Sequence, residues 1–443
     1  MLDCTYRVEV PHRTGQLARV MGAIAAGEGL IGDVVTLSVG REASVREITV
    51  EVRDGAQAQR ISDLIDAIEG VRVLWHQDRA LMRHQGGKLR IEPIHRVHSV
   101  QQMRDVYTPG VARVCTAIAQ RPELAHRYTM IPRSVAICTN GSRVLGLGNI
   151  GPVASMPVME GKAVFYAQFA GISATPILLE TGEVEEFVET VVRIAPTFGG
   201  IHLEDISAPE CFEIERRLIE RLSQPVMHDD VHGTAVVSVA ATIVACQQAG
   251  VELRAATVGQ LGLGAAGFGI ASLMVQSGAR RVIAFDPLDA ARERVRALGV
   301  QPATMERVLS EADVVIATTG RAGLIEPSMV RRGQVILALT NPDPEIEPER
   351  AERAGAVFAA DGRSVNNVLG YPGIFRGALQ AGAREINVEM KLAAARELAG
   401  LAGEGQLVPD ALDQRVHEAV AKAVREAAQL SGAARPEHAA VDL

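Results

Sequence analysis

The residues best suited to chemistry are two pairs of adjacent carboxylates beside apolar segments. Glu204 and Asp205 follow a Gly-Gly pair and a short strand-like segment, and Asp229 and Asp230 stand just before a long helical pattern. An isolated acidic pair is usually a solvated turn, but two pairs in such positions favour a cation site. Carboxylate ligands that leave positions for water and a chelating substrate suit Mg²⁺ or Mn²⁺. Two histidines beside the second pair would favour a softer metal if both bound.

Lys162 lies among small and apolar residues in a chain that otherwise prefers arginine. The sequence has 4 lysines and 41 arginines. Arginine is not deprotonated in proteins, whereas burial can lower the pKa of a lysine from about 10.4 toward neutrality. Lys162 is therefore a candidate base, and a lysine at a helix start with its head in solvent is the alternative. For the other three lysines solvent exposure is a sufficient explanation: Lys88, Lys391 and Lys422.

Two segments match the GxGxxG pattern of dinucleotide-binding turns. The pattern needs a strand before it, a helix after it and an acidic residue about 20 positions on. The segment 262–267 meets all three, because Asp286 stands 19 residues beyond Gly267 at the end of a strand-like run. The segment 146–151 lacks the acid and runs into prolines that oppose an immediate long helix. We therefore predict that the cofactor turn consists of Gly262, Gly264, Ala265, Ala266 and Gly267.

The cofactor that this turn predicts is NAD, with NADP as the alternative. A carboxylate at Asp286 accepts hydrogen bonds from a ribose diol and repels a 2′-phosphate. Arg292 and Arg294 are close enough in sequence to weaken that preference. Thr319 and Asn341 follow two later strand-like runs, where ligands bind in parallel α/β sheets, and complete the predicted cofactor site.

The elements that position these residues alternate between strand and helix. Short apolar runs at 312–320, 334–342 and 356–362 are typical of parallel strands covered by helices. The sequence predicts an α/β fold in which an α/β substrate domain precedes a Rossmann domain with a parallel sheet. The predicted boundaries are 88–225 for the substrate domain, 226–375 for the Rossmann domain, 376–430 for C-terminal helices that return to the substrate domain, and 431–443 for a disordered tail.

The N-terminal segment 5–77 has six short elements in the order βαββαβ, which is that of the ferredoxin-like fold. It resembles the ACT regulatory domains, in which a conserved turn joins the first strand to the first helix. The corresponding segment, HRTGQL (12–17), keeps Gly15 and Leu17 but lacks the acidic residue and the proline of that turn. We predict an ACT-like domain over 1–84. It serves either to bind an amino acid or another small effector, or only for dimerisation and packing.

Six segments, read in order, resemble the motif series of bacterial malic enzymes. They are VYTPGVA (106–112), NGSRVLGLGNIG (140–151), MEGKAV (159–164), LEDISAPECFEIE (203–215), HDDVHGTA (228–235) and NNVLGYPGIFRGAL (366–379). The resemblance covers roughly residues 88–400. It implies oxidative decarboxylation of malate to pyruvate and CO2 with reduction of NAD(P), by a homodimer or a larger homo-oligomer.

The same resemblance implies a role for each matching residue. Lys162 is implied as the general base, and Tyr107, which precedes a Thr-Pro-Gly turn, as the general acid that protonates C3. Asp229 is the less favoured ligand of its pair. The implied metal ligands are Glu204, Asp205 and Asp230. The implied malate-binding residues are Arg143, Asn341 and Asn367.

Composition excludes several classes of function. The net charge of −8, without blocks of like charge, gives no footprint for nucleic acid or an anionic membrane surface. Five single cysteines without a CxxC pair favour neither a zinc cluster nor a disulfide framework. The longest apolar segment, near 235–246, is too short to span a bilayer, and no signal peptide is evident. We therefore expect a soluble, cytoplasmic protein.

Three alternatives to a malic enzyme are kept. A malolactic or oxaloacetate-decarboxylating enzyme would use the same residues, and net NADH formation with malate separates it from a malic enzyme. An amino-acid dehydrogenase also joins a catalytic lysine to a Rossmann domain but needs no metal, so its activity would survive EDTA. An ACT-based amino-acid sensor without catalytic activity would bind amino acids and turn over no malate.

Overall fold

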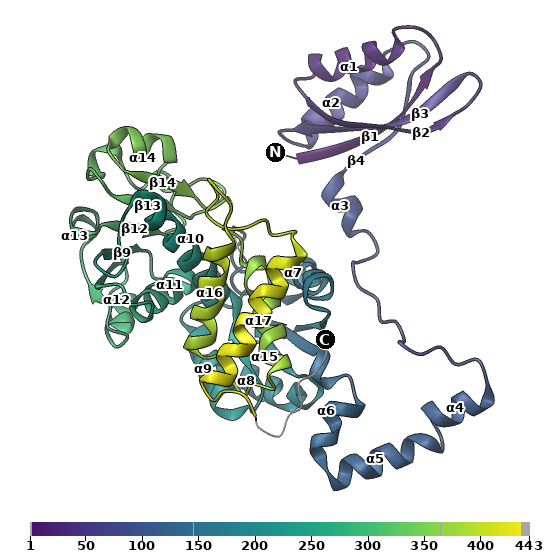
Figure 1. The fold of residues 1–443 in the computed structure, drawn as a ribbon. Coiled ribbons are helices and arrows are strands. Elements are labelled where there is room, and N and C mark those ends of the chain that lie inside the picture. The colour runs from purple at the N-terminus through teal and green to yellow at the C-terminus, as the bar shows by residue number, and fades with distance from the viewer. Residues whose placement is uncertain (1, 145, 364, 436–443) are drawn as a thin grey trace. The chain divides into compact units, whose positions relative to one another are not determined.

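The computed structural model describes residues 2–144, 146–363 and 365–435. The chain forms two compact units, Met1–Arg90 and Ile91–Leu443 (Figure 1). The remaining residues of the predicted tail, 436–443, lie outside the described residues. Within the described part of that tail, residues 433–435 are hydrogen-bonded to the backbone of residues 382, 384 and 428.

The N-terminal unit is one antiparallel sheet with the strand order β2-β3-β1-β4 and two helices packed on it. Its elements are β1 (Leu2–Pro11), α1 (Gln16–Ala26), β2 (Leu30–Val39), β3 (Ala43–Val52), α2 (Gly55–Asp66), β4 (Arg72–Asp78) and α3 (Arg79–His84). Alternate residues of β1, Tyr6, Val8 and Val10, are buried in the core of this unit, as the two-residue period of a strand requires. The order of the first six elements is the predicted βαββαβ.

Strand β2 forms one edge of this sheet, and all ten of its residues are exposed. Ile31 and Val34 pair with Val50 and Ile48 of β3, which are fully buried, yet they are 40% and 41% exposed themselves. The core that covers β3 therefore does not extend over β2. An exposed apolar edge strand is a ready site for pairing with another chain.

The second unit begins with helices that bury none of their residues. These are α4 (Val100–Val106) and α5 (Gly110–Gln120). The chain then passes through short helices into the first sheet: η1 (Pro122–Leu124), α6 (Ala125–Tyr128) and η2 (Ile131–Arg133). We call residues 91–120 the arm.

The first sheet of this unit has four parallel strands in the order β6-β5-β7-β8. They are β5 (Ser134–Thr139), β6 (Ser173–Leu178), β7 (Gly200–Leu203) and β8 (Val226–His228). The helices between them are α7 (Pro152–Phe165) with the π-helical turn η3 (Tyr166–Ala170), α8 (Val184–Ile194) with η4 (Ala195–Thr197), and α9 (Glu210–Arg221). Because β8 pairs with β7, residues 226–228 belong to this sheet, although the predicted boundary placed them in the Rossmann domain.

The second sheet is the predicted Rossmann sheet, with six parallel strands in the order β11-β10-β9-β12-β13-β14. Its strands are β9 (Thr257–Leu261), β10 (Arg281–Phe285), β11 (Gln301–Pro302), β12 (Val314–Ala317), β13 (Val335–Ala338) and β14 (Phe358–Asp361). Its helices are α11 (Ala265–Gln276), α12 (Asp289–Arg296), α13 (Met305–Glu311), η6 (Pro327–Met329) and α14 (Pro348–Ala354). The strand order reverses between β9 and β12, which is where such sheets bind dinucleotides.

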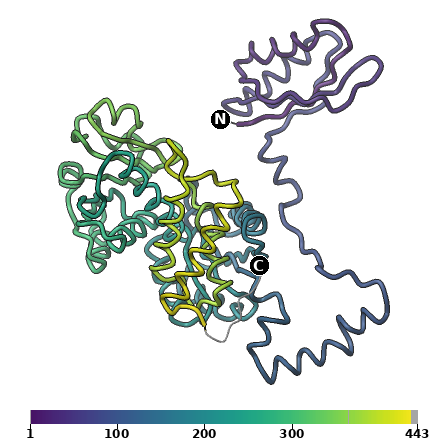
Figure 2. Tube along the Cα trace, in the orientation of Figure 1, coloured from purple at the N-terminus to yellow at the C-terminus, as the bar shows by residue number. Residues whose placement is uncertain are grey.

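A long helix connects the two sheets, and three C-terminal helices pack beside it. The connecting helix is α10 (Thr234–Ala249), which follows the π-helical turn η5 (Asp229–Gly233). After η7 (Asn367–Leu369) come α15 (Tyr371–Gln380), α16 (Val388–Leu401) and α17 (Gln414–Leu430). Helix α16 packs on α10, while α15 and α17 contact each other and η3 on the side of the first sheet (Figure 2). One apolar core extends from β5 through α10 to β9.

Turn η5 and α10 together form a helical segment of 21 residues, Asp229–Ala249, which is longer than the apolar run seen in the sequence. Its length and composition would allow it to cross a membrane. However, 78% of its most apolar window is buried inside the protein, as in the core helix of a globular fold.

Candidate active site

The two carboxylate pairs meet at the carboxyl edge of the first sheet. Glu204 and Asp205 directly follow β7, and Asp229 and Asp230 directly follow β8. Strands β7 and β8 are parallel neighbours, with Leu203 opposite His228, so both pairs emerge at the same edge. This is the edge at which open α/β sheets bind ligands.

Three of these carboxylates form a set that can hold a metal ion. Oxygen atoms of Glu204, Asp205 and Asp230 all lie within 4.8 Å of one another. The backbone N–H of Asp205 donates to Asp230 Oδ2 at 3.0 Å, and Asp205 has a left-handed backbone with φ of 53°. Asp205 Oδ2 is buried and has no hydrogen-bond partner among the described residues. A buried carboxylate oxygen without a donor fits a cation ligand.

Lys162 lies in the last turn of α7 and is buried beside these carboxylates. Its Nζ forms ion pairs with Glu204 Oε1 at 3.0 Å and with Asp229 Oδ2. It also lies 4.5 Å from the ring centroid of Tyr371, a cation–π distance. The alternative of a solvent-exposed lysine at a helix start is therefore wrong. The pairing of Asp229 with Lys162 also agrees with its lower rank as a metal ligand.

The electrostatics of the cluster differ from the expectation of a lowered lysine pKa. Burial lowers the pKa of Lys162, but attraction to Asp229 and Glu204 outweighs burial and raises it well above its ordinary value. Burial raises the pKa of Glu204 to about 8; burial and the neighbouring carboxylates raise that of Asp205 to about 8. Burial raises the pKa of Asp229 to about 6. The predicted lowering of the Lys162 pKa was wrong because it took account of burial but not of the neighbouring carboxylates.

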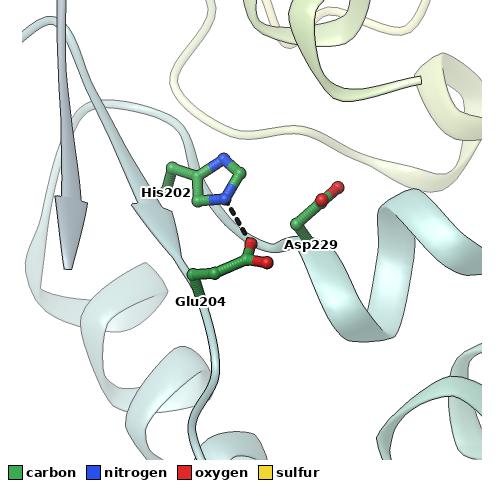
Figure 3. A group of neighbouring side chains, drawn as sticks. All are labelled: His202, Glu204 and Asp229. Carbon is green, nitrogen blue, oxygen red and sulfur yellow. Dashed lines mark hydrogen bonds and ion pairs between the residues drawn. The ribbon is translucent and has the colours of Figure 1, made fainter. Parts of the chain in front are cut away.

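His202 joins the cluster, although sequence reasoning did not single it out. It lies on β7 two residues before Glu204, so both side chains project from the same face of the strand. Its Nε2 lies 2.7 Å from Glu204 Oε2 (Figure 3), and its Nδ1 lies 2.9 Å from the hydroxyl of Tyr166. His202, Glu204 and Asp229 also have ligand atoms within 4.8 Å. Since both ring nitrogens of His202 already have partners, the oxygen set is the better cation site. The two-residue spacing was the signal that could have revealed His202.

Two glycines allow turn η5 to hold its carboxylates close to the cofactor helix. A Cβ at Gly233 would overlap Asp229 Oδ1, and a Cβ at Gly269 on α11 would overlap the carbonyl oxygen of Val231. At Gly269 only glycine fits without moving the turn or the helix, and at Gly233 a Cβ would displace the carboxylate of Asp229.

A second buried network fixes the other side of η5. Glu215 Oε1 accepts from the backbone N–H of His228 at 2.7 Å, and Glu215 Oε2 lies 3.0 Å from His232 Nε2. Lys391 Nζ donates to His232 Nδ1 at 3.1 Å. Although burial raises the pKa of Glu215, the interaction with His232 and the charge of Lys391 lower it to about 2. Both ring nitrogens of His232 have partners, so His232 is not available as a metal ligand. A softer metal bound by both His228 and His232 is therefore disfavoured. Lys391 is thus engaged with its neighbours, contrary to the expectation of simple exposure.

The cofactor turn has the local geometry that the sequence predicted. Gly262 has φ of 85°, and a Cβ there would lie 2.6 Å from the carbonyl oxygen of Thr318. A Cβ at Gly267 would overlap the carbonyl oxygen of Gly262, whereas one at Gly264 would meet open space. Ala265 and Ala266 begin α11, whose N-terminus faces the turn. Asp286, at the end of β10, accepts backbone N–H groups from Leu263 at 2.8 Å and Leu288 at 2.9 Å.

Thr319 and Asn341 lie beyond β12 and β13, at the carboxyl edge of the Rossmann sheet. The backbone N–H and the hydroxyl of Thr319 both donate to Glu345 Oε1, at 2.7 and 2.8 Å. The hydroxyl of Thr340 donates to the same oxygen at 2.6 Å. Asn341 Nδ2 donates to the carbonyl of Gly362 at 3.2 Å. Glu345 is fully buried and joins two cofactor-side loops, and sequence reasoning missed it.

The other predicted site residues have fewer contacts with the Lys162 cluster. Tyr107 directly follows α4 and is 70% exposed. Among the described residues, no hydrogen bond or ring contact joins it to that cluster. Arg143 is exposed, and its backbone N–H donates to the carbonyl of Asp205 at 3.1 Å. Asn367 begins η7, which contacts η5.

The first glycine segment corrects one expectation. Gly146 and Gly148 form a tight turn with φ of 75° and 74°, but the chain after it enters the 14-residue helix α7 at once. Pro152 is tolerated because it occupies the first turn, where its missing N–H would have no partner in any case.

Comparisons with known proteins agree with this arrangement. Residues 87–219 match the family model described as malic enzyme, N-terminal domain, and residues 235–322 match the D-isomer specific 2-hydroxyacid dehydrogenase, NAD binding domain. The NAD-dependent malic enzyme 1 of Bacillus subtilis is 52% identical over 96% of this chain and 97% of its own length. The bifunctional malic/malolactic enzyme of that organism is 42% identical over 81% of this chain and 94% of its own. The crystal structure of malic enzyme from Pyrococcus horikoshii has a TM-score of 0.76 and 38% identity over 82% of this chain and 92% of that one.

Proposed function

The chain belongs to the malic enzyme family, and from this premise we propose that it converts malate to pyruvate and CO2 with reduction of NAD(P). The observation that carries the proposal is the buried contact of Lys162 with Glu204 and Asp229, beside the Glu204, Asp205 and Asp230 set. A base and a cation site at one sheet edge are what the reaction requires.

Three carboxylates fit a divalent cation. Glu204, Asp205 and Asp230 would hold Mg²⁺ or Mn²⁺, because their oxygens converge and their ligand chemistry is that of hard cations. A cation held there would supply Lewis-acid chemistry: polarisation of the C2 carbonyl and stabilisation of the negative charge left after loss of CO2.

Lys162 is the base in this proposal. It takes the proton of the C2 hydroxyl while C2 transfers hydride to the nicotinamide. Before that it must lose its own proton, and the charges of Asp229 and Glu204 stabilise the protonated lysine. Neutralisation of the Glu204 charge would lower the pKa of Lys162. Arg143, Asn341 and Asn367 bind the substrate in this proposal, and an arginine can hold a carboxylate through two hydrogen bonds.

Tyr107 is the acid that protonates C3, and we assign that role within a homodimer. Tyr107 and the apolar side chains before it are exposed on the arm, with Val100 70%, Met103 51% and Val106 55% exposed. An amphipathic helix that buries none of its residues lacks the tertiary packing on which most helices depend. Packing of the arm on a second copy would cover this surface and carry Tyr107 toward a site.

The preferred cofactor in this proposal is NAD. We assign Asp286, which follows β10, to the ribose hydroxyls. Arg292 donates to the backbone carbonyl of Asp286 and pairs with Asp289. An arginine engaged in this way is less available to a 2′-phosphate than one with a free side chain.

The N-terminal unit acts as an ACT-like module in this proposal, either to bind a small effector or to add a second dimer interface. The exposed apolar edge of β2 supports the interface role.

A specific observation also keeps malolactic activity as a second candidate. A relative named as a bifunctional malic/malolactic enzyme is 42% identical to this chain. Lactate formation without net NADH would identify that activity.

Initial rates with malate test the proposal. We expect reduction of the nicotinamide cofactor that requires Mn²⁺ or Mg²⁺, stops with EDTA and is faster with NAD than with NADP. Turnover of an amino acid that survives EDTA would instead indicate a metal-independent amino-acid dehydrogenase.

A further inference from the structure

We propose that Tyr166 and His202 are positioning residues that fix the carboxylate of Glu204 for cation binding. This inference rests on the proposed function, because it concerns the same cation site. The four residues that carry it form a continuous series of polar contacts: Lys162, Glu204, His202 and Tyr166.

The series of contacts joins the continuous helix α7–η3 to strand β7. Lys162 and Tyr166 are four residues apart, in the last turn of α7 and the first residue of η3, so they lie on the same side of the helix. His202 and Glu204 are two residues apart on the same face of the β7 segment. Lys162 reaches Glu204 directly at 3.0 Å, while Tyr166 reaches it through His202.

The direction of the hydrogen bonds follows from the chemistry of the groups. A carboxylate that binds a cation is ionised and only accepts hydrogen bonds, so in that state the nitrogen of His202 that faces Glu204 Oε2 must carry the proton. In the neutral ring the other nitrogen, Nδ1, is then an acceptor, and the hydroxyl of Tyr166 donates to it. Tyr166 thereby selects the tautomer of His202, and His202 occupies Oε2. The other oxygen, Oε1, lies 3.0 Å from Lys162 Nζ, so both oxygens of Glu204 are held in place.

Packing prevents these side chains from finding other arrangements. Tyr166 and His202 are fully buried, and Glu204 is 3% exposed. The ring of His202 lies 5.4 Å from that of Tyr371 and 5.8 Å from that of Phe375, with Tyr166 against both aromatic rings. These buried polar contacts lead to Glu204, which is one of the three proposed cation ligands. Side chains that hydrogen-bond to metal ligands typically contribute about 10- to 100-fold to metal affinity.

The test is Mn²⁺ binding to the metal-free enzyme, measured by electron paramagnetic resonance of free Mn²⁺, with malate turnover as a second readout. His202→Leu removes the donor to Glu204 and should weaken Mn²⁺ binding by about 10- to 100-fold. His202→Gln keeps an N–H donor near the position of Nε2 and should recover most of the affinity. Tyr166→Phe removes one hydroxyl, keeps the ring packing, and should weaken Mn²⁺ binding by a smaller factor.

Tyr6→Phe is the matched control. Tyr6 is also fully buried, stacks on a histidine, and donates to the carbonyl of Ala58, but it lies in the N-terminal unit. It should leave Mn²⁺ binding unchanged even if it lowers the melting temperature.

The outcomes separate this inference from the proposed function. Unchanged Mn²⁺ affinity in folded Tyr166→Phe and His202→Leu, with the affinity lost in Glu204→Gln, would overturn the positioning role and leave the cation site intact. If His202→Leu does not fold, unchanged affinity in Tyr166→Phe alone overturns it. A wild-type enzyme that binds no Mn²⁺ would overturn the proposed cation site itself.

Discussion

Two opposing effects act on the pKa of Lys162, and the residues next to it in sequence reveal neither. Burial disfavours its charge, and the carboxylates of Asp229 and Glu204 favour it more strongly. A lysine that is to act as a base must therefore be released by a change in the charge of those carboxylates. In the proposed mechanism, a cation bound by Glu204 would neutralise part of that charge and so favour release of the lysine proton.

Replacement of Lys162 by alanine should lower malate-dependent NADH formation by about 10²- to 10⁴-fold, the usual contribution of a general acid or base. Steady-state kinetics at saturating malate and Mn²⁺ measure the change. Lys422→Ala, exposed on α17, is the control and should retain wild-type rates. Undiminished turnover in Lys162→Ala would exclude the lysine as base.

The pKa values of Glu204 and Asp205 predict a pH-dependent stability in the metal-free enzyme. Both are raised to about 8 from ordinary values of 4.5 and 3.8, so in this window the folded state binds more protons than the unfolded chain. Stability from these groups is therefore present at low pH and lost as the pH rises from about 4 toward 8.

Thermal melting of EDTA-treated protein at pH 5 and pH 8 measures this effect. The decrease in melting temperature should be larger for wild type than for Asp205→Asn, which cannot ionise at that position. Mn²⁺ should raise the melting temperature more at pH 8 than at pH 5. An equal decrease in both proteins would contradict the raised pKa of Asp205.

Among the elements, turn η5 and helix α11 connect the cation site to the cofactor site. Gly269 of α11 lies so close to the carbonyl of Val231 that the two segments are in backbone contact. The segment with the carboxylates and the helix that opens the cofactor turn are therefore held at a fixed separation, which hydride transfer between malate and nicotinamide requires.

Gly269→Ala should separate η5 from α11 or strain one of them, at a cost of about 1–3 kcal/mol in the free energy of unfolding, as overpacking usually has. Chemical denaturation measures the stability, and malate turnover should fall as well. The control is Gly400→Ala in α16, where a Cβ meets nothing within 4 Å and should be neutral or stabilising. Full stability in Gly269→Ala would show that the contact relaxes without effect.

At the scale of the whole molecule, two apolar surfaces are exposed, one on the arm and one on edge strand β2. In the homodimer that we propose, Tyr107 on the arm of one subunit would serve the Lys162 site of the other.

Subunit complementation tests this arrangement. Tyr107→Phe and Lys162→Ala should each be nearly inactive alone. Mixed and allowed to exchange subunits, they should regain about a quarter of wild-type activity, because half of the dimers are mixed and each mixed dimer has one intact site. No recovery in verified mixed dimers would place both residues of a site on one subunit.

The sequence by itself determined the features that depend on near neighbours along the chain. The cofactor turn 262–267 with Asp286, the carboxylate pairs and the order of strands and helices all follow from local spacing, turn chemistry and periodicity. One local inference was wrong: prolines after Gly151 did not prevent helix α7, because the first of them occupies a position that tolerates proline.

Only the tertiary structure decided which groups share a buried site. Three features depend on segments that are distant in sequence. They are the raised pKa of Lys162, the contacts of His202 with Tyr166 and Glu204, and the hydrogen bond from Lys391 to His232 of η5. Hydrogen bonds and charges act over a few ångströms of space, and in a buried site they are strong because water does not screen them. Residue types and their spacing therefore identified the chemistry, whereas the approach of β7, η3 and η5 set the protonation and orientation of the groups that perform it.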